Sequence, residues 1–187
     1  MLSAIALCSR ALLKIGAGTI ASFDEGTAES EVAANLYDST RDALLSAYPW
    51  NFATGQATLP RLAATPVADY DHAYQLPSDF LRAISAGEEA GSGLNYRIAE
   101  SRLHTNAPAV VLTYVFRPAE EDFPPFFDQA LIARLAADFC LPLTESASRA
   151  DLLYRLAEDE YRKAKLTDAQ QDVPSAITHF PLVDVRG

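Results

Sequence analysis

The stretch Tyr48-Pro49-Trp50-Asn51-Phe52 separates two parts of the sequence that differ in pattern. Before it, residues 2–15 and 28–47 carry apolar side chains at three- and four-residue steps, which predicts two amphipathic helices. Pro49 ends the second of these, because the residue before a proline resists helical geometry. After the stretch, short alternating or apolar runs stand between turn residues, which is typical of strands.

The strand region continues to about residue 123. After it, the sequence again shows helical periodicity. We expect strands over 69–76, 80–86, 94–99 and 109–116, with turns at 91–93 and 106–108, in a small antiparallel sheet domain of four to six strands. A third helix is expected from about 126 to Pro142, and a fourth over 146–169.

Each predicted helix has an apolar stripe that should face a core. The stripe of the first helix is Leu2, Ile5, Cys8, Leu12 and Ile15. That of the second is Val32, Leu36, Thr40, Ala43, Leu44 and Ala47. That of the third is Phe127, Ala130, Leu131, Ile132, Leu135, Ala136 and Phe139. That of the fourth is Leu152, Leu153, Leu156, Ala157, Tyr161 and Ala164.

The order of elements predicts an α+β fold. The simplest arrangement is an antiparallel helical bundle formed by the N- and C-terminal helix pairs, with the strand region inserted as a small antiparallel β domain. We expect the bundle to comprise residues 1–50 and 124–171, the β domain 51–123, and an extended C-terminal docking tail 172–187.

Three aromatic side chains in the dividing stretch are candidates for subunit packing: Tyr48, Trp50 and Phe52. One interpretation is a hydrophobic plug beneath the bundle. The other is an aromatic contact with a neighbouring subunit, since Trp and Tyr are favoured at the centres of interfaces. The two interpretations are compatible.

The predicted tail is too broken by Pro174 and Pro181 for a helix, yet it is rich in apolar side chains. This pattern indicates a segment that binds a partner, although a tail folded back on its own bundle would also cover such residues. The residues expected to bind the partner are Ile177, Phe180, Leu182, Val183, Val185 and Arg186.

The sequence contains no motif for catalysis, a cofactor or a metal. There is no phosphate-binding glycine loop, no nucleophile elbow and no His-Glu-x-x-His. We expect His72, His104 and His179 at surface or partly packed positions, and Cys8 and Cys140 as buried thiols. The acidic clusters are interpreted as solvated faces rather than metal sites. We therefore expect no enzymatic activity, no catalytic residues, no cofactor and no metal.

The overall charge and hydropathy limit the partners. The formal net charge is −10 and the pI about 4.7, which disfavours nucleic-acid binding, because phosphate contacts require clustered Lys and Arg. No run approaches the roughly 18 apolar residues of a membrane span. Arg10 and Lys14 interrupt the apolar start, so we expect neither a signal peptide nor a membrane association.

Several segments resemble the tail tubular protein A family, the head-to-tail adaptors of short-tailed phages. The most specific are Pro49-Trp50-Asn51-Phe52-Ala53 and Leu76-Pro77-Ser78-Asp79, the latter similar to a Leu-Pro-x-Asp segment of that family. Residues 11–20, 22–26 and 37–45 are also similar to the opening of the family. The C-terminal order of an apolar helix, a charged helix and a short tail with an arginine also fits the pattern of that family.

The resemblance implies a helical bundle with an inserted β domain and a closed ring, usually of twelve copies. It further implies that the ring lies in the neck of the virion, is assembled in the host cytoplasm, binds the portal protein above and a tail nozzle or tail tube protein below, and lets genome DNA pass without sequence-specific binding. Alternatives are a connector, stopper or tail-completion protein of a long-tailed phage or phage-like particle, a small hydrolase that uses the acidic clusters, and a bacterial regulatory module.

Overall fold

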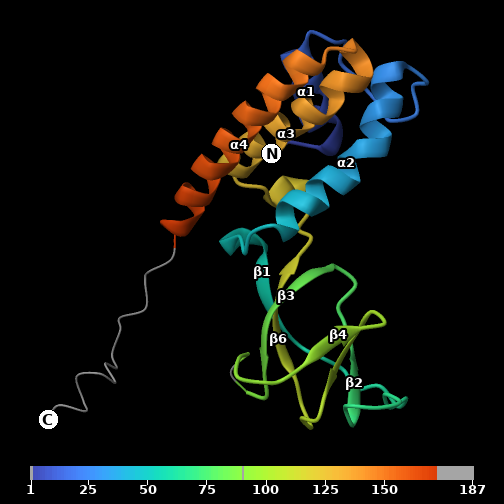
Figure 1. Ribbon diagram of the computed structural model, residues 1–187, viewed down its shortest axis with the longest axis vertical. Coiled ribbons are helices and arrows are strands. Elements are labelled where there is room, and N and C mark those ends of the chain that lie inside the picture. Colours follow the sequence, from blue (N-terminus) through green and yellow to red (C-terminus); the bar gives the residue numbers. More distant parts are fainter. Residues whose placement is uncertain (1, 90, 172–187) are drawn as a thin grey trace, which may run out of the picture.

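The computed structural model describes residues 2–89 and 91–171, so the six predicted tail residues, Ile177 to Arg186, lie outside the described part of the chain. Four helices form one bundle (Figure 1). The central helix is α3, against which α1, α2 and α4 each pack. The helices are α1 (Ala4–Ile15), α2 (Ala28–Ser46), α3 (Pro125–Thr144) and α4 (Ala147–Ala169).

The β domain lies beyond one end of the bundle and consists of two antiparallel sheets of three strands each (Figure 1). Their strand orders are β1-β6-β3 and β2-β5-β4. The strands are β1 (Thr54–Thr58), β2 (His72–Gln75), β3 (Phe80–Gly87), β4 (Arg97–Ala99), β5 (Arg102–Thr105) and β6 (Val111–Phe116). Short 3₁₀ helices, η1 (Asn51–Ala53) and η2 (Glu120–Asp122), occur where the chain enters and leaves the domain. The predicted α+β architecture is confirmed.

Three local predictions were wrong. The strand prediction missed β1, whose sequence Thr-Gly-Gln-Ala-Thr is polar and which lies at a sheet edge. It also missed β5, which follows a tight turn made by Glu100 and Ser101, two non-glycine residues with positive φ. Pro142 does not end α3, because a proline so close to the C-terminus of a helix costs one hydrogen bond while the remaining turn closes through Glu145 N–H to the Leu141 carbonyl.

The stripes of α1 and α3 were predicted well, but those of α2 and α4 were not. Thr40 and Leu44 of the predicted stripe of α2 are buried, but its buried face also includes Ser30 and Arg41, which are polar and therefore do not register in an apolar pattern. On α4 the buried residues are small, with Ala150, Ala157 and Ala164 at seven-residue intervals. Several predicted core residues are instead exposed: Ala43, Ala47, Leu152 and Leu156.

Trp50 lies in the core at the junction of the bundle and the β domain. Its side chain is 0% exposed, and its indole Nε1–H donates to the Leu44 carbonyl at 3.1 Å. Aromatic rings from both ends of the chain surround it, with centroids 5.0–6.4 Å away: Tyr48, Phe52, Phe126, Phe127 and Tyr161. The interpretation of this stretch as a hydrophobic plug is confirmed, and Trp50 offers no surface to a neighbouring subunit, whereas Tyr48 and Phe52 are half-buried.

The residue after the tryptophan connects this junction to the far end of α4. The Asn51 backbone N–H donates to the Asp168 carboxylate at 3.0 Å, and the Asn51 side-chain amide donates to the Asp168 carbonyl at 2.8 Å. Asp168 is fully buried. Burial raises the pKa of its carboxyl, while the Asn51 N–H favours the charged form. The C-terminal end of the bundle is thereby bound to the entrance of the β domain.

Replacing Trp50 should therefore damage the fold itself. Trp50→Ala removes a fully enclosed ring and should lower the free energy of unfolding by about 3–5 kcal/mol. Chemical denaturation followed by circular dichroism measures this loss. Leu166→Ala, at a side chain that is 62% exposed, is the control and should change stability by less than about 0.5 kcal/mol. Equal effects of the two substitutions would contradict the assignment of Trp50 to the core.

Candidate functional site

A network of charged side chains joins α2 to the chain that leaves the β domain. The Arg41 side chain, 10% exposed, contacts the carboxylates of Asp38, Asp42 and Glu120 at 2.9–3.0 Å. Arg117, just after β6, binds both carboxylate oxygens of Asp42. Burial alone would raise the pKa of Asp42, but the hydrogen bonds from Arg117 and Arg41 hold it below its ordinary value. The network fixes the exit of the β domain against the bundle.

The turn between β2 and β3 lies next to this exit. The Asp79 carbonyl accepts the Arg117 backbone N–H at 2.9 Å, and the Asp79 carboxylate accepts the Tyr114 hydroxyl at 3.3 Å. Leu76, in the same turn, is buried in the core of the β domain. The Leu76–Asp79 segment thus holds the β2–β3 turn on β6 where β6 approaches the bundle.

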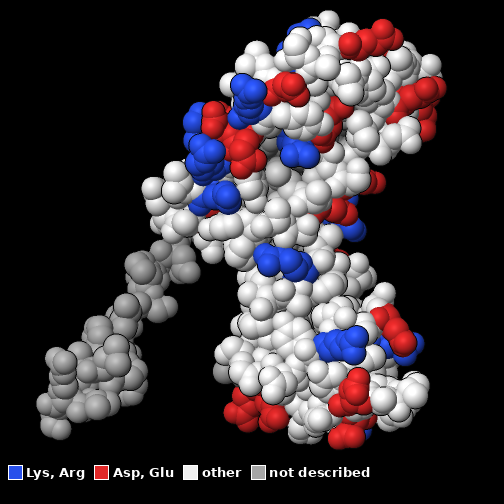
Figure 2. Space-filling model, in the orientation of Figure 1, with Lys and Arg blue, Asp and Glu red and all other residues white. Residues whose placement is uncertain are grey.

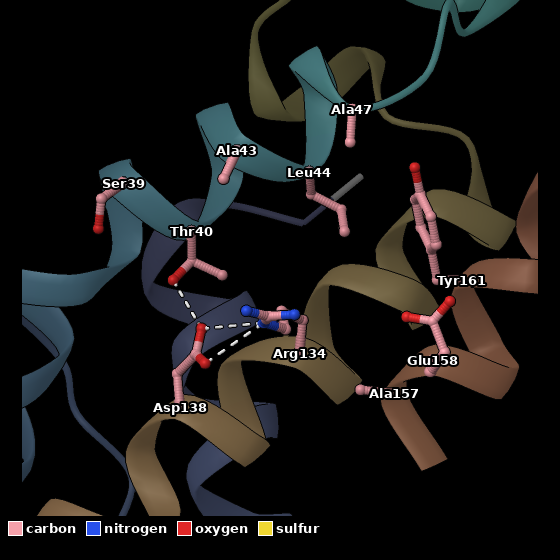
Figure 3. Close-up of a pocket in the computed structure, with 10 residues that line it drawn as sticks. All are labelled: Ser39, Thr40, Ala43, Leu44, Ala47, Arg134, Asp138, Ala157, Glu158 and Tyr161. Atoms are coloured by element: carbon pink, nitrogen blue, oxygen red, sulfur yellow. Dashed lines mark hydrogen bonds and ion pairs between the residues drawn. The ribbon is translucent and has the colours of Figure 1, made fainter. Parts of the chain in front are cut away.

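A groove runs over α3 between α2 and α4 and has a volume of about 440 Å³ (Figure 3). Its wall on the α4 side includes Tyr161, whose ring packs edge-on against Trp50 with the two ring centroids 5.7 Å apart. The groove therefore adjoins the Trp50 cluster. Small and apolar side chains make up half of its lining, and polar ones the rest. The lining residues are Ser39, Thr40, Ala43, Leu44, Ala47, Arg134, Asp138, Ala157, Glu158 and Tyr161.

The carboxylate of Asp138 on the groove floor is already occupied by hydrogen bonds. It accepts a hydrogen bond from the Thr40 hydroxyl at 2.8 Å and pairs with Arg134 at 3.3 Å (Figure 3). It also accepts a hydrogen bond from the Tyr154 hydroxyl at 2.8 Å. Burial, together with the hydrogen bond to Asp138, raises the pKa of Tyr154. Asp138 of α3 is thus hydrogen-bonded to Thr40 of α2 and Tyr154 of α4, so its carboxylate connects the three helices that line the groove.

The structure brings together some of the residues singled out in the sequence. Tyr48, Trp50 and Phe52 form one cluster at the junction, whereas the tail residues and His179 lie outside the described chain. His104 is buried, contrary to expectation, because β5 is the central strand of its sheet. The cysteines are buried and unpaired as predicted, and burial raises the pKa of Cys8 to about 12.

Within residues 2–89 and 91–171, no group of three or more His, Cys, Asp or Glu side chains could hold a metal ion. In the same part of the chain, no helix has both the length and the hydropathy needed to cross a bilayer. A scan against known protein families finds no family that matches this sequence, and no curated protein matches it either.

Sequence reasoning did not find the groove. Its lining combines α2 with α3 and α4, which are consecutive to each other but far from α2 in the sequence, and its small residues resemble ordinary core alanines. The signal in the sequence that bears on the groove is the predicted apolar stripe of α2. Two of its residues, Ala43 and Ala47, are not buried in the core and line the groove instead.

The Asp42 network gives a prediction about pH. Asp42→Asn should lower the free energy of unfolding by about 1–3 kcal/mol at pH 7, because hydrogen bonds to charged groups are lost. The pKa of Asp42 is lower in the folded than in the unfolded protein. Its contribution is therefore present above the ordinary carboxyl pKa of about 4 and disappears as the pH falls through the folded value.

The difference in the free energy of unfolding between the Asp42→Asn variant and the parent should accordingly shrink on acidification from about pH 7 to about pH 3. Denaturation midpoints measured across this range test it. Asp38→Asn is the control, since Asp38 also pairs with Arg41 but its side chain is 77% exposed. This substitution should lower the free energy of unfolding by no more than about 1 kcal/mol. A deficit for Asp42→Asn that grows toward low pH would contradict this account of the network.

Proposed function

We propose that this chain is a structural protein of a phage virion, a head-to-tail adaptor. In this proposal its copies form a ring, usually of twelve, that joins the portal to the tail. Genome DNA passes through the channel without sequence-specific binding. The partners are other copies of the chain, the portal protein and a tail nozzle or tail tube protein.

One observation carries the proposal. The two segments that most specifically resemble the adaptor family both lie where the bundle and the β domain meet. The Pro49–Ala53 segment places Trp50 among aromatic rings from both ends of the chain, and the Leu76–Asp79 segment holds the β2–β3 turn beside Arg117. The resemblance therefore falls on residues that fix the architecture.

The surface supports a role in assembly. Exposed leucines on α4 and a groove between α2 and α4 offer contacts that the described chain does not itself fill. Lys, Arg, Asp and Glu side chains gather along α4 in Figure 2, while much of the remaining visible face is uncharged. A net charge of −10 per copy would also keep a channel wall from retaining DNA.

The proposal predicts assembly on the cognate portal. The purified chain should be monomeric or weakly associating alone and should form a ring when mixed with portal rings, because portal contacts orient the copies for a closed interface. Native mass spectrometry of the mixture measures the number of copies bound. A chain that never migrates with the portal on a sizing column would contradict the proposal.

The matched variant lacks residues 173–187. Its melting temperature should stay nearly unchanged while portal binding is lost, since the apolar tail residues and Arg186 are proposed to bind the portal. A large loss of stability, with portal binding retained by the molecules that still fold, would instead indicate a tail folded back on its own bundle.

A further inference from the structure

Two apolar faces of the bundle are left uncovered by residues 2–89 and 91–171. On α2, Ala43 and Ala47 from the predicted stripe are exposed beside the groove. On α4, Leu152 and Leu156 are 57% and 49% exposed. Single surface leucines are ordinary in soluble proteins, but these residues belong to two continuous faces that differ in shape and charge.

The first face is the groove between α2 and α4. Its small side chains, Ala43, Ala47 and Ala157, leave a hollow of about 440 Å³ over α3 (Figure 3). The charge of Asp138 is balanced by Arg134, whereas Glu158 on the α4 wall forms no ion pair with any described residue. The groove is thus a partly apolar hollow bordered by the carboxylate of Glu158 and by the Lys165 ammonium, which lies 4.5 Å from the centroid of the Tyr161 ring.

The second face is a ridge formed by Leu152 and Leu156, one turn apart on α4. Leu156 precedes Glu158 by two positions, or about 200° around the helix, so ridge and groove lie on opposite sides of α4. Arg149 stands one turn before Leu152, on the same side of the helix. On the α1 side, Lys14 and Leu156 line one smaller cavity.

Among the described residues beside the ridge, Arg149 and Lys14 are charges without an ion pair, and both are positive. Both side chains are exposed. Two acidic residues also lie beside the ridge, and both are paired: Glu160 with Lys163 at 2.7 Å, and Asp159, one turn after Leu156, with Arg162 at 3.1 Å. The ridge therefore presents leucines flanked by unpaired cations, which are complementary to Glu158 on the groove wall.

We propose that the Leu152–Leu156 ridge of one copy docks in the α2–α4 groove of the next copy. This inference rests on the proposed ring. A ring requires two different faces on each subunit, since such an interface repeats head to tail until rotation closes it. Leucines entering a hollow of small residues bury apolar surface, and Glu158 meets the cations of the ridge. A symmetric dimer through the ridge would instead place Arg149 and Lys14 near their own copies.

Cysteine cross-linking tests this arrangement. Ala43→Cys and Leu152→Cys alter exposed positions in the groove and on the ridge, while the native Cys8 and Cys140 are buried. A chain with both substitutions should give a ladder of covalent oligomers under mild oxidation, which traps even transient contacts. The two single variants should each stay monomeric alone and form a covalent dimer only when mixed.

The matched control combines Ala34→Cys with Leu152→Cys. Ala34 is exposed on α2 nine residues from Ala43, so it lies on the opposite side of that helix and should give no ladder. Adding Glu158→Lys to the Ala43→Cys/Leu152→Cys chain should shorten its ladder by placing like charges together.

The oxidation is carried out with the chain alone and with portal rings. A ladder of cross-linked oligomers from a chain that does not bind the portal would support this interface and contradict the proposed ring on the portal. Absence of the ladder in both samples, or covalent dimers of a single variant alone, would overturn the interface even if rings form on the portal. A ladder that appears only after deletion of residues 173–187 would also overturn it, and would assign the groove to the tail.

Discussion

The enclosure of the Trp50 indole is the interaction on which the rest of the structure depends. The ring lies at the single point where α2, η1, α3 and α4 converge, and its neighbours come from positions as distant as Tyr48 and Tyr161. Burying an aromatic ring of this size supplies several kcal/mol, comparable with much of the net stability of a domain. The Trp50 cluster therefore joins α2 to α3 and α4 at the end of the bundle next to the β domain, while α1 packs on α3 through the rest of the same core.

The same junction sets the position of the β domain. The chain enters through η1, held by Asn51 on Asp168, and leaves through Arg117 and η2, held on α2 by Asp42 and Arg41. Because both the entering and the leaving connection are held on the helices, rotation of the sheets relative to the bundle is restricted. A subunit of this kind suits the proposed ring, because each copy must carry its contacts at fixed positions if the ring is to close.

The sequence predicted the architecture better than the surfaces. The four helices and the strand region followed from periodicity and from Pro49, and the α3 stripe was correct because a central helix is apolar around much of its circumference. The faces of α2 and α4 were misplaced because the core accepts Ser30, Arg41 and Asp168, which hydrogen bonds and ion pairs make tolerable when buried. Strand β1 was missed because its edge position tolerates polar residues. The groove arises only from packing, so no local pattern could indicate it.

The central claim is that the chain is a ring subunit between portal and tail. Electron cryomicroscopy of the particle that carries this protein tests it most directly. The account predicts a closed ring of copies in the neck, each with its bundle and β domain joined as they are here and with the channel on the ring axis. Density for the chain at another place in the particle, or a neck built without it, would contradict the account.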